Sequence, residues 1–378
     1  MMDKNVRKLY INMSLRVGHF LYFTSINSCN LYKMDIMTKE VYVEMKYPCE
    51  LLGVPKLVKM ISYGSKLWMI PCDYDEIVVY DLVSRTITSL RIPNVNIFCS
   101  YDTNFIEPIV DGKYLWLHLS DRPITIRLNM EQYSVCFYYL QSSSVKFNQL
   151  PEPCMESMVI SDRGLYLFRD KSNKSIKIDL ETNTIEPCEY NVCSRIGEKI
   201  TEETVLFSPA QKGQSLLLLN LHSREEKQIN LPEWIWGNDE QIQYVFIRVI
   251  GSYAYLLPYY ANAIIKMHIQ TKELKYISLT DMKADSLSEC DKYSVWDLVN
   301  IDDEIWGIPY MGNSIIRISE QGDVVGQVNL SVFEQDFIPS IGINEIRKEI
   351  KSYGLREFAN LDKVQHVELT IEHRYEIF

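Results

Sequence analysis

Residues 55–93 read PKLVKMISYGSKLWMIPCDYDEIVVYDLVSRTITSLRIP, and this stretch decides the fold of the chain. Short apolar runs rich in β-branched and aromatic residues alternate there with turn residues such as Gly, Ser and Asp. The pattern predicts strands at Lys56–Tyr63, Lys66–Ile70, Ile77–Leu82 and Thr86–Ile92. Strands this short, joined by turns this tight, form a small four-stranded antiparallel sheet.

The same unit recurs seven times along the chain. In six copies an aromatic residue in an apolar run precedes a small polar residue by thirteen positions. These pairs are Tyr22 and Asp35, Trp68 and Asp81, Trp116 and Asn129, Tyr166 and Asp179, Tyr255 and His268, and Trp306 and Ser319. A degenerate copy, Leu206 and Asn220, has an interval of fourteen. Successive copies start 46, 48, 50, 40, 49 and 51 residues apart, a period typical of propeller blades and longer than that of helical hairpins.

The repeat predicts an all-β chain, a seven-bladed β-propeller of four-stranded antiparallel blades. The propeller is expected over residues 1–332, with blades near 8–48, 55–93, 97–140, 154–190, 196–232, 241–279 and 293–330. Residues 333–378 form a C-terminal extension, in which Asn344–Ala359 approximates an amphipathic helix and Val367–Ile377 alternates as a strand. This strand is expected to close the ring by pairing with the first or last blade, to pack outside the propeller, or to pair with another subunit.

Each recurring position has a structural role. The aromatic ring on the second strand is broad enough to fill the space between neighbouring blades. The polar residue that ends the third strand is expected to bond the backbone N–H groups of its own turn. Four of the seven copies have a proline three residues past the aromatic position, where a strand ends and no ladder bond is lost: Pro71, Pro209, Pro258 and Pro309.

Composition narrows the classes of partner and compartment. The chain has 378 residues and a formal net charge of −11, which repels nucleic acid and anionic lipid at long range. Nucleic acid is therefore not expected as a partner. Neither a signal peptide nor an apolar stretch long enough to span a membrane is evident. Nine scattered cysteines without a CxxC pair favour free thiols and a cytoplasmic location.

The repeat resembles that of the virginiamycin B lyase-like and NHL-type propeller proteins, most closely in EIWGIPYMGNSIIRISEQGDVVGQVNL, residues 304–330. The resemblance covers about Leu9 to Leu330 and implies architecture only. Kelch repeats would need Gly-Gly doublets, which this chain lacks, and the single Trp296-Asp297 does not end a third strand as a WD40 signature would. The lyase's metal-binding and acid–base residues have no match here one by one.

The candidate binding surface is the face formed by the loops between second and third strands and between blades. These loops combine carboxylates, cations and tyrosines, a mixture that suits a polar ligand, a peptide or a glycan. The candidate residues are Asp73, Tyr74, Asp75, Arg122, Arg169, Tyr259, Tyr260, Asn262, Tyr310 and Asn313.

Catalytic signatures are sparse. The six histidines show no metal-ligand spacing, and no P-loop or nucleophile-elbow motif occurs. His118 is expected in the core and His268 in a turn. The sequence therefore predicts a non-catalytic binding or scaffold module for a protein, peptide or glycan, without cofactor or metal. The alternative is a lyase or hydrolase that uses loop carboxylates, such as Asp73 and Asp75, and tyrosines around the central channel, with or without a divalent metal.

Overall fold

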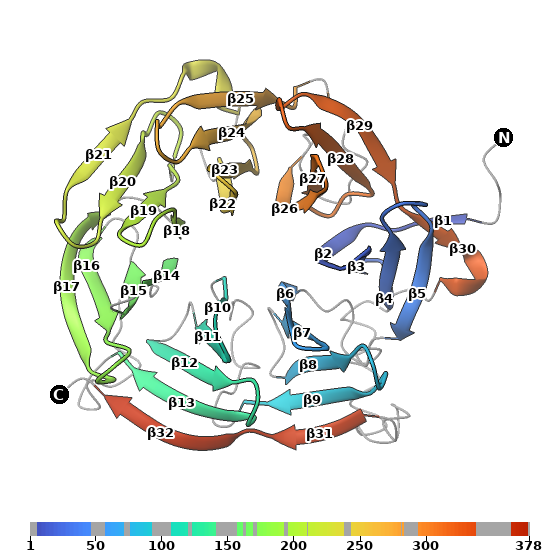
Figure 1. Cartoon of the computed structure of the whole chain (residues 1–378), viewed down its shortest axis with the longest axis horizontal. Helices are drawn as coiled ribbons and strands as arrows, with labels where there is room; N and C mark the ends of the chain where they lie inside the picture. The colour runs from blue at the N-terminus through green and yellow to red at the C-terminus, as the bar shows by residue number, and fades with distance from the viewer. Residues whose placement is uncertain are drawn as a thin grey trace, which may run out of the picture. The chain divides into compact units, whose positions relative to one another are not determined.

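The computed structural model describes residues 6–46, 57–71, 76–92, 107–119, 123–140, 157–161, 164–168, 172–192, 196–209, 211–237, 243–280, 282, 294–337 and 364–376. Seven four-stranded antiparallel blades confirm the all-β, seven-bladed propeller (Figure 1). The predicted helix at Asn344–Ala359 lies outside the described residues. The chain divides into two compact units, Met1–Cys99 with Met282–Glu368 and Ser100–Asp281 with Leu369–Phe378.

The first unit holds blades 1, 2 and 7. Blade 1 is β2 (Ile11–Val17), β3 (Phe20–Ser25), β4 (Ser28–Asp35) and β5 (Val41–Lys46). Blade 2 is β6 (Leu57–Tyr63), β7 (Lys66–Pro71), β8 (Glu76–Asp81) and β9 (Ile87–Arg91). Blade 7 is β26 (Val295–Ile301), β27 (Glu304–Pro309), β28 (Ser314–Ser319) and β29 (Val324–Asn329).

The second unit holds blades 3 to 6. Blade 3 is β10 (Ile109–Asp111), β11 (Tyr114–His118), β12 (Ile124–Asn129) and β13 (Ser134–Tyr139). Blade 4 is β14 (Ser157–Ser161), β15 (Gly164–Phe168), β16 (Ser172–Ile178) and β17 (Ile185–Val192). Blade 5 is β18 (Gly197–Lys199), β19 (Thr204–Phe207), β20 (Leu216–Asn220) and β21 (Glu226–Ile229). Blade 6 is β22 (Tyr244–Ile250), β23 (Tyr253–Pro258), β24 (Ala263–His268) and β25 (Leu274–Ser278).

The interval of thirteen is the register of the central hairpin. In blade 2, Trp68 lies opposite Val79, and Asp81 lies opposite Lys66. The polar residue therefore pairs with the residue two positions before the aromatic. In blade 5, Leu206 lies opposite Leu218 and Thr204 opposite Asn220, so the interval of fourteen reflects a hairpin loop longer by one residue.

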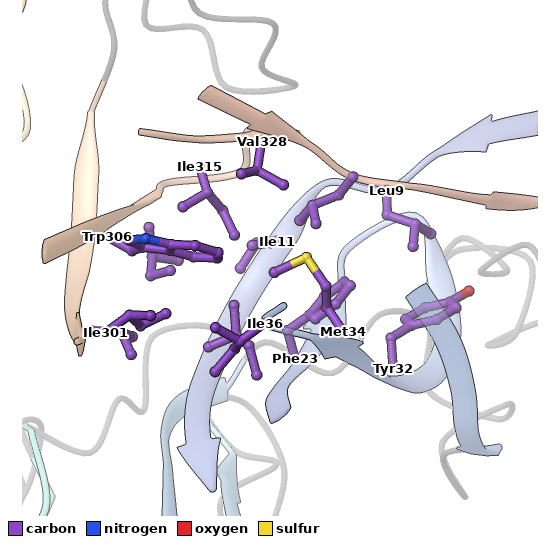
Figure 2. Packing of buried hydrophobic residues seen from close by; sticks show 14 of the residues in the cluster. Leu9, Ile11, Phe23, Tyr32, Met34, Ile36, Ile301, Trp306, Ile315 and Val328 are labelled. Carbon is purple, nitrogen blue, oxygen red and sulfur yellow. The ribbon is translucent and has the colours of Figure 1, made fainter. Parts of the chain in front are cut away.

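In four blades of the described chain the recurring aromatic packs with residues of the next blade, as predicted. Trp306 of blade 7 is buried in one cluster with residues of blade 1, among them Phe23, Met34 and Ile36 (Figure 2). Trp116 of blade 3 packs in the same way with residues of blade 4. Because two blades lose apolar surface to water at each such contact, the rings hold neighbouring blades together.

The small polar residue at the end of the third strand organises its own turn, which confirms the second predicted role. The Oδ1 atom of Asp81 accepts hydrogen bonds from the N–H groups of Val83 at 2.9 Å and Ser84 at 3.1 Å. Corresponding pairs of bonds are made by Asp35, Asn129, Asp179 and Asn220. His268 accepts from the N–H of Thr271 through its Nδ1 atom at 3.2 Å, as expected for a turn residue.

A cation faces the aromatic across the ladder in five blades, a feature that the sequence analysis missed. The opposed pairs are Tyr22 and Lys33, Trp116 and Arg127, Tyr166 and Lys177, Tyr255 and Lys266, and Trp306 and Arg317. Lys266 is only 7% exposed, and its Nζ atom lies 4.0 Å from the centroid of the Tyr253 ring. The aromatic faces therefore stabilise a nearly buried charge.

Both ends of the chain add strands to the propeller. β1 (Val6–Lys8) pairs antiparallel with β30 (Ser331–Phe333), which follows blade 7, and the Leu9 N–H donates to the Leu330 carbonyl at 3.1 Å. The N-terminal segment thus ties blade 1 to blade 7. The C-terminal strand does not pair with the first or last blade: β31 (Val364–Glu368) pairs with β9 of blade 2, and β32 (Thr370–Glu376) pairs with β13 of blade 3.

Candidate functional site

The structure describes five of the ten candidate residues. Asp73, Tyr74, Asp75, Arg122 and Arg169 lie outside the described residues. The other five occupy the loops between the second and third strands of two blades: Tyr259, Tyr260 and Asn262 in blade 6, and Tyr310 and Asn313 in blade 7.

In blade 6, Asn262 fastens its loop to the preceding inter-blade segment. Its Nδ2 atom donates to the carbonyl oxygens of Trp234 at 2.9 Å and Trp236 at 2.8 Å, and its backbone N–H donates to Ile235 at 2.7 Å. These carbonyls belong to or flank a 3₁₀ helix, η3 (Glu233–Ile235). Because all three bonds are internal to the protein, Asn262 positions the loop that carries the tyrosines.

The tyrosines of blade 6 are fixed through their backbone. Gln243, which is fully buried, accepts hydrogen bonds from the N–H of Tyr259 at 2.9 Å through its carbonyl and from the N–H of Gly237 at 2.9 Å through its side chain. A Cβ atom at Gly237 would lie 1.9 Å from the Tyr260 carbonyl oxygen. Only glycine therefore allows the two segments to approach this closely.

Two aromatic pairs come from this assembly. The rings of Tyr259 and Tyr260 are half-buried and meet edge to face, with centroids 4.7 Å apart. Trp234 is 50% exposed, and its ring meets Tyr276 of β25 edge to face at 5.5 Å. Rigid, partly exposed rings of this kind offer apolar area at a small cost in conformational entropy.

Blade 7 carries a second aromatic pair, in the first unit. The Tyr310 ring stacks on the Trp296 ring with centroids 4.5 Å apart and an angle of 27° between the planes. The backbone N–H of Tyr310 donates to the Ser294 carbonyl at 2.9 Å. Trp296 lies at a β-bulge, since Val295 pairs with Pro309 but Asp297 pairs with Ile308. A bulge redirects a side chain, and here both rings remain partly exposed.

Asn313 has a different position from the tyrosines. It is only 4% exposed, its Oδ1 atom accepts a hydrogen bond from the Ser314 hydroxyl at 3.2 Å, and its carbonyl accepts from the Leu330 N–H at 2.8 Å. These contacts are internal, as for Asn262. Asn313 is therefore buried beneath its loop, whereas Tyr259, Tyr260 and Tyr310 are partly exposed.

Trp234 and Trp296 are partly exposed aromatic residues that contact the candidate loops and that sequence reasoning missed. Both lie outside the recurring aromatic position of the blades, Trp234 in the segment PEWIWG and Trp296 at the start of a first strand. A search for tryptophans that the repeat does not explain would have found them. Tryptophan is rarely placed at a surface without a packing or binding role.

The titratable groups of the described residues do not form a metal-binding cluster. Within the described residues no group of three or more His, Cys, Asp or Glu side chains could hold a metal ion. His118 is fully buried, its Nδ1 atom lies 2.9 Å from the Thr125 hydroxyl, and burial lowers its pKa to about 3. The ring is therefore neutral at physiological pH, in the core position expected for it.

Cys136 and Cys188 are free thiols. Desolvation raises the pKa of both side chains, that of Cys188 to about 11. Both thiols are therefore protonated and unreactive at neutral pH.

Among the described residues, no helix has the length and apolar character that crossing a bilayer requires.

Comparison with known proteins reveals likeness of fold only. No family model matches the chain, and no curated protein matches it in sequence. A catalytically inactive variant of virginiamycin B lyase from Staphylococcus aureus with quinupristin superposes with a TM-score of 0.56 at 11% identity, covering 82% of this chain and 94% of the lyase. YCF48 bound to D1 peptide superposes with a TM-score of 0.54 at 7% identity, covering 82% of this chain and 93% of YCF48. The chain thus shares the seven-bladed propeller arrangement of virginiamycin B lyase and other propeller proteins.

Proposed function

We propose that this chain is a non-catalytic binding module whose loops engage a peptide, protein or glycan through partly exposed aromatic side chains. The observation that carries the proposal is the anchoring of Tyr259 and Tyr260. Their loop is held by the Gln243 and Asn262 hydrogen bonds, although neither bond involves a phenol ring. A protein that fixes a loop backbone while leaving its rings partly exposed has a pre-organised contact surface, which lowers the entropy lost on binding.

The Trp296–Tyr310 pair supports the same role in the first unit. It stacks in a parallel manner rather than edge to face, so it presents a broad apolar face. Peptide side chains and sugar rings both bind to such faces. The solved complex of YCF48 with a peptide is a precedent for a peptide partner on a propeller of this shape.

The protonation states of the described histidine and cysteine side chains support a binding role more than a catalytic one. His118 is neutral and buried, and Cys188 has a raised pKa, so neither offers a base or a thiolate near neutral pH. Asp73 and Asp75 remain the candidates for a lyase or hydrolase. We include a cytoplasmic location in the proposal, since the free thiols Cys136 and Cys188 suit a reducing compartment.

A paired array experiment tests the proposal. The wild-type chain is probed against a tiled-peptide array and a glycan array, and every hit is measured again with the Tyr259→Ala/Tyr260→Ala variant and with Tyr310→Ala. We expect at least one class of hit to weaken about tenfold or more in one of these variants. The matched control is Tyr42→Ala, which removes a 43% exposed ring from β5 of blade 1. Hits that survive both loop variants unchanged would contradict the proposal.

A further inference from the structure

The chain ends in a strand that adds a fifth member to the sheet of blade 3. β32 runs parallel to β13, from the Ser134–Thr370 pair to the Tyr139–Glu376 pair, and Figure 1 shows it in red along the outer side of β13. The preceding residues, β31, run parallel to β9 of blade 2 in the first unit. Both ladders are parallel, whereas every ladder within a blade is antiparallel.

The strand that β32 covers differs from the uncovered fourth strands. β13 reads SVCFYY, a run without a charged residue, and with β32 in place it buries five of its six residues. Uncovered fourth strands are mostly exposed: β5 and β29 each bury one residue of six, and β21 buries none of its four. An apolar edge strand left bare would pair with other chains. The β13 edge therefore has the composition of a site that a strand must occupy.

The occupying strand keeps most of its described side chains exposed. Leu369, just before β32, is 2% exposed, but Thr370, Glu372, His373 and Arg374 are exposed. Glu372 accepts hydrogen bonds from the Ser134 hydroxyl and from the Cys136 thiol at 3.5 Å. The buried Leu369 and the Glu372 carboxylate thus supplement a backbone ladder. Departure of the strand would leave the four strands of blade 3 intact.

We propose that β31 and β32 are exchangeable together between copies of this chain, so that Val364–Glu368 of one copy occupies the β9 edge of another and Thr370–Glu376 its β13 edge. Every copy carries β32, whose register and carboxylate match this edge. Exchange preserves each contact of the docked strand, which makes it a low-cost route to a dimer. Residues 338–363 separate the described Phe337 from Val364, and 26 residues reach at most about 90 Å when fully extended.

The net charge of the chain determines how formation of the exchanged dimer should depend on salt concentration. Each chain has a formal net charge of −11, so two copies repel each other at low ionic strength. Salt screens this repulsion, while the ladder and Leu369 are little affected. The exchanged dimer should therefore increase with both protein concentration and salt.

A designed cross-link distinguishes exchange from docking within one chain. The Glu372→Cys substitution places a thiol beside Cys136, so mild oxidation should link the two positions. The variant is prepared in light and ¹⁵N-labelled forms, mixed at high concentration in high salt, oxidised and digested. We expect linked peptides that join Cys136 of a light chain to the introduced thiol of a heavy chain. The Glu372→Ser and Cys136→Ser/Glu372→Cys controls cannot form this link.

The molecular mass of the protein in solution shows, independently of cross-linking, whether a dimer forms. The wild-type chain should show a species of twice the chain mass that grows with concentration. Links confined to light–light and heavy–heavy pairs, or a single-chain mass at every concentration, would overturn the proposal.

Discussion

The indole of Trp296 stacks on the phenol of Tyr310, with ring centroids 4.5 Å apart and planes 27° apart. The two residues come from different parts of blade 7, and the bulge at Trp296 allows the stack to form. Trp296 also packs against a buried cluster of blades 1 and 2. One ring of the pair is thus fixed to the core of the first unit, and it supports the other.

Removing each ring of this pair should have different consequences. Tyr310→Ala loses the stacking contact, and we expect the free energy of unfolding to fall by about 1 kcal/mol. Trp296→Ala also loses contacts with the buried cluster and should cost about 2–3 kcal/mol. Denaturant titrations followed by circular dichroism measure both changes. If Tyr310→Ala costs as much as Trp296→Ala, Tyr310 is a packing residue and its role in binding is refuted.

Tryptophans at the recurring position should matter more for stability than exposed ones. Trp306 is 1% exposed between blades 7 and 1, so Trp306→Ala should cost about 3–5 kcal/mol. Trp234 is half exposed, and Trp234→Ala should cost about 1 kcal/mol or less. Thermal melting of the two variants under identical conditions tests the difference. Equal losses would mean that the recurring ring is not what holds neighbouring blades together.

The turn carboxylates make stability depend on acid. Hydrogen bonds from the N–H and hydroxyl of Thr182 lower the pKa of Asp179 from 3.8 to about 2. The folded chain therefore binds this proton less tightly than the unfolded chain does. The contribution of Asp179 is complete above about pH 4 and is lost as the pH falls towards 2.

Asp179→Asn should remove this dependence while keeping the turn, because Asn129 and Asn220 make the same bonds without charge. Unfolding measured between about pH 2 and 5 should show a shallower loss of stability in Asp179→Asn than in the wild type. The reverse variant, Asn129→Asp, should show a steeper loss. Parallel curves for all three proteins would mean that the turn bonds do not favour the ionised carboxylate.

A left-handed backbone residue recurs four positions after the turn residue. Six non-glycine residues there have φ between 55° and 66°: Lys39, Arg85, Tyr133, Asn183, Arg224 and Lys272. Glycine adopts this conformation without the steric cost of a Cβ atom. Arg85→Gly should therefore stabilise the chain, by about 0.5–1 kcal/mol after the entropy of the unfolded state is included. Ser84→Gly in the same turn should destabilise it. A loss of stability in Arg85→Gly would show that its side chain has a role that outweighs the strain.

The sequence predicted the elements whose partners are close in the chain. An aromatic and a polar residue thirteen positions apart define one hairpin register, and Trp68 with Asp81 takes it. The same arithmetic could have found the cations, since Lys266 follows Tyr255 by eleven positions and lies opposite it. The spacing was used only to pair the aromatic with the polar residues, so the cations were missed.

The C-terminal strand marks the limit of such reasoning. Alternation in Val367–Ile377 predicted a strand, and one forms at β32. Alternation does not reveal which of the distant sheet edges will accept a strand, because that choice depends on which edges are left bare after folding. The apolar run Ser134–Tyr139 was the available signal, since a fourth strand buried on both faces needs cover.

The positions of the candidate loops could also be predicted, because they depend only on residues that are close together in the chain. A loop between the second and third strands follows directly from the repeat, which located Tyr259, Tyr260 and Tyr310. The sequence did not indicate that Asn262 and Asn313 would point inward. The Asn262 hydrogen bonds to Trp234 and Trp236 join segments that are far apart in the chain, so they form only when these segments meet.

The most direct test of binding without catalysis uses the peptide or glycan that binds most strongly on the arrays. Titration calorimetry measures the affinity of the wild-type chain for this hit. Mass spectrometry of the hit recovered afterwards shows whether any of its covalent bonds has changed. The account predicts a hit of unaltered mass, an affinity about tenfold or more lower for Tyr259→Ala/Tyr260→Ala or Tyr310→Ala, and full affinity for Tyr42→Ala. A hit recovered with an altered mass, or bound equally well by both loop variants, would contradict it.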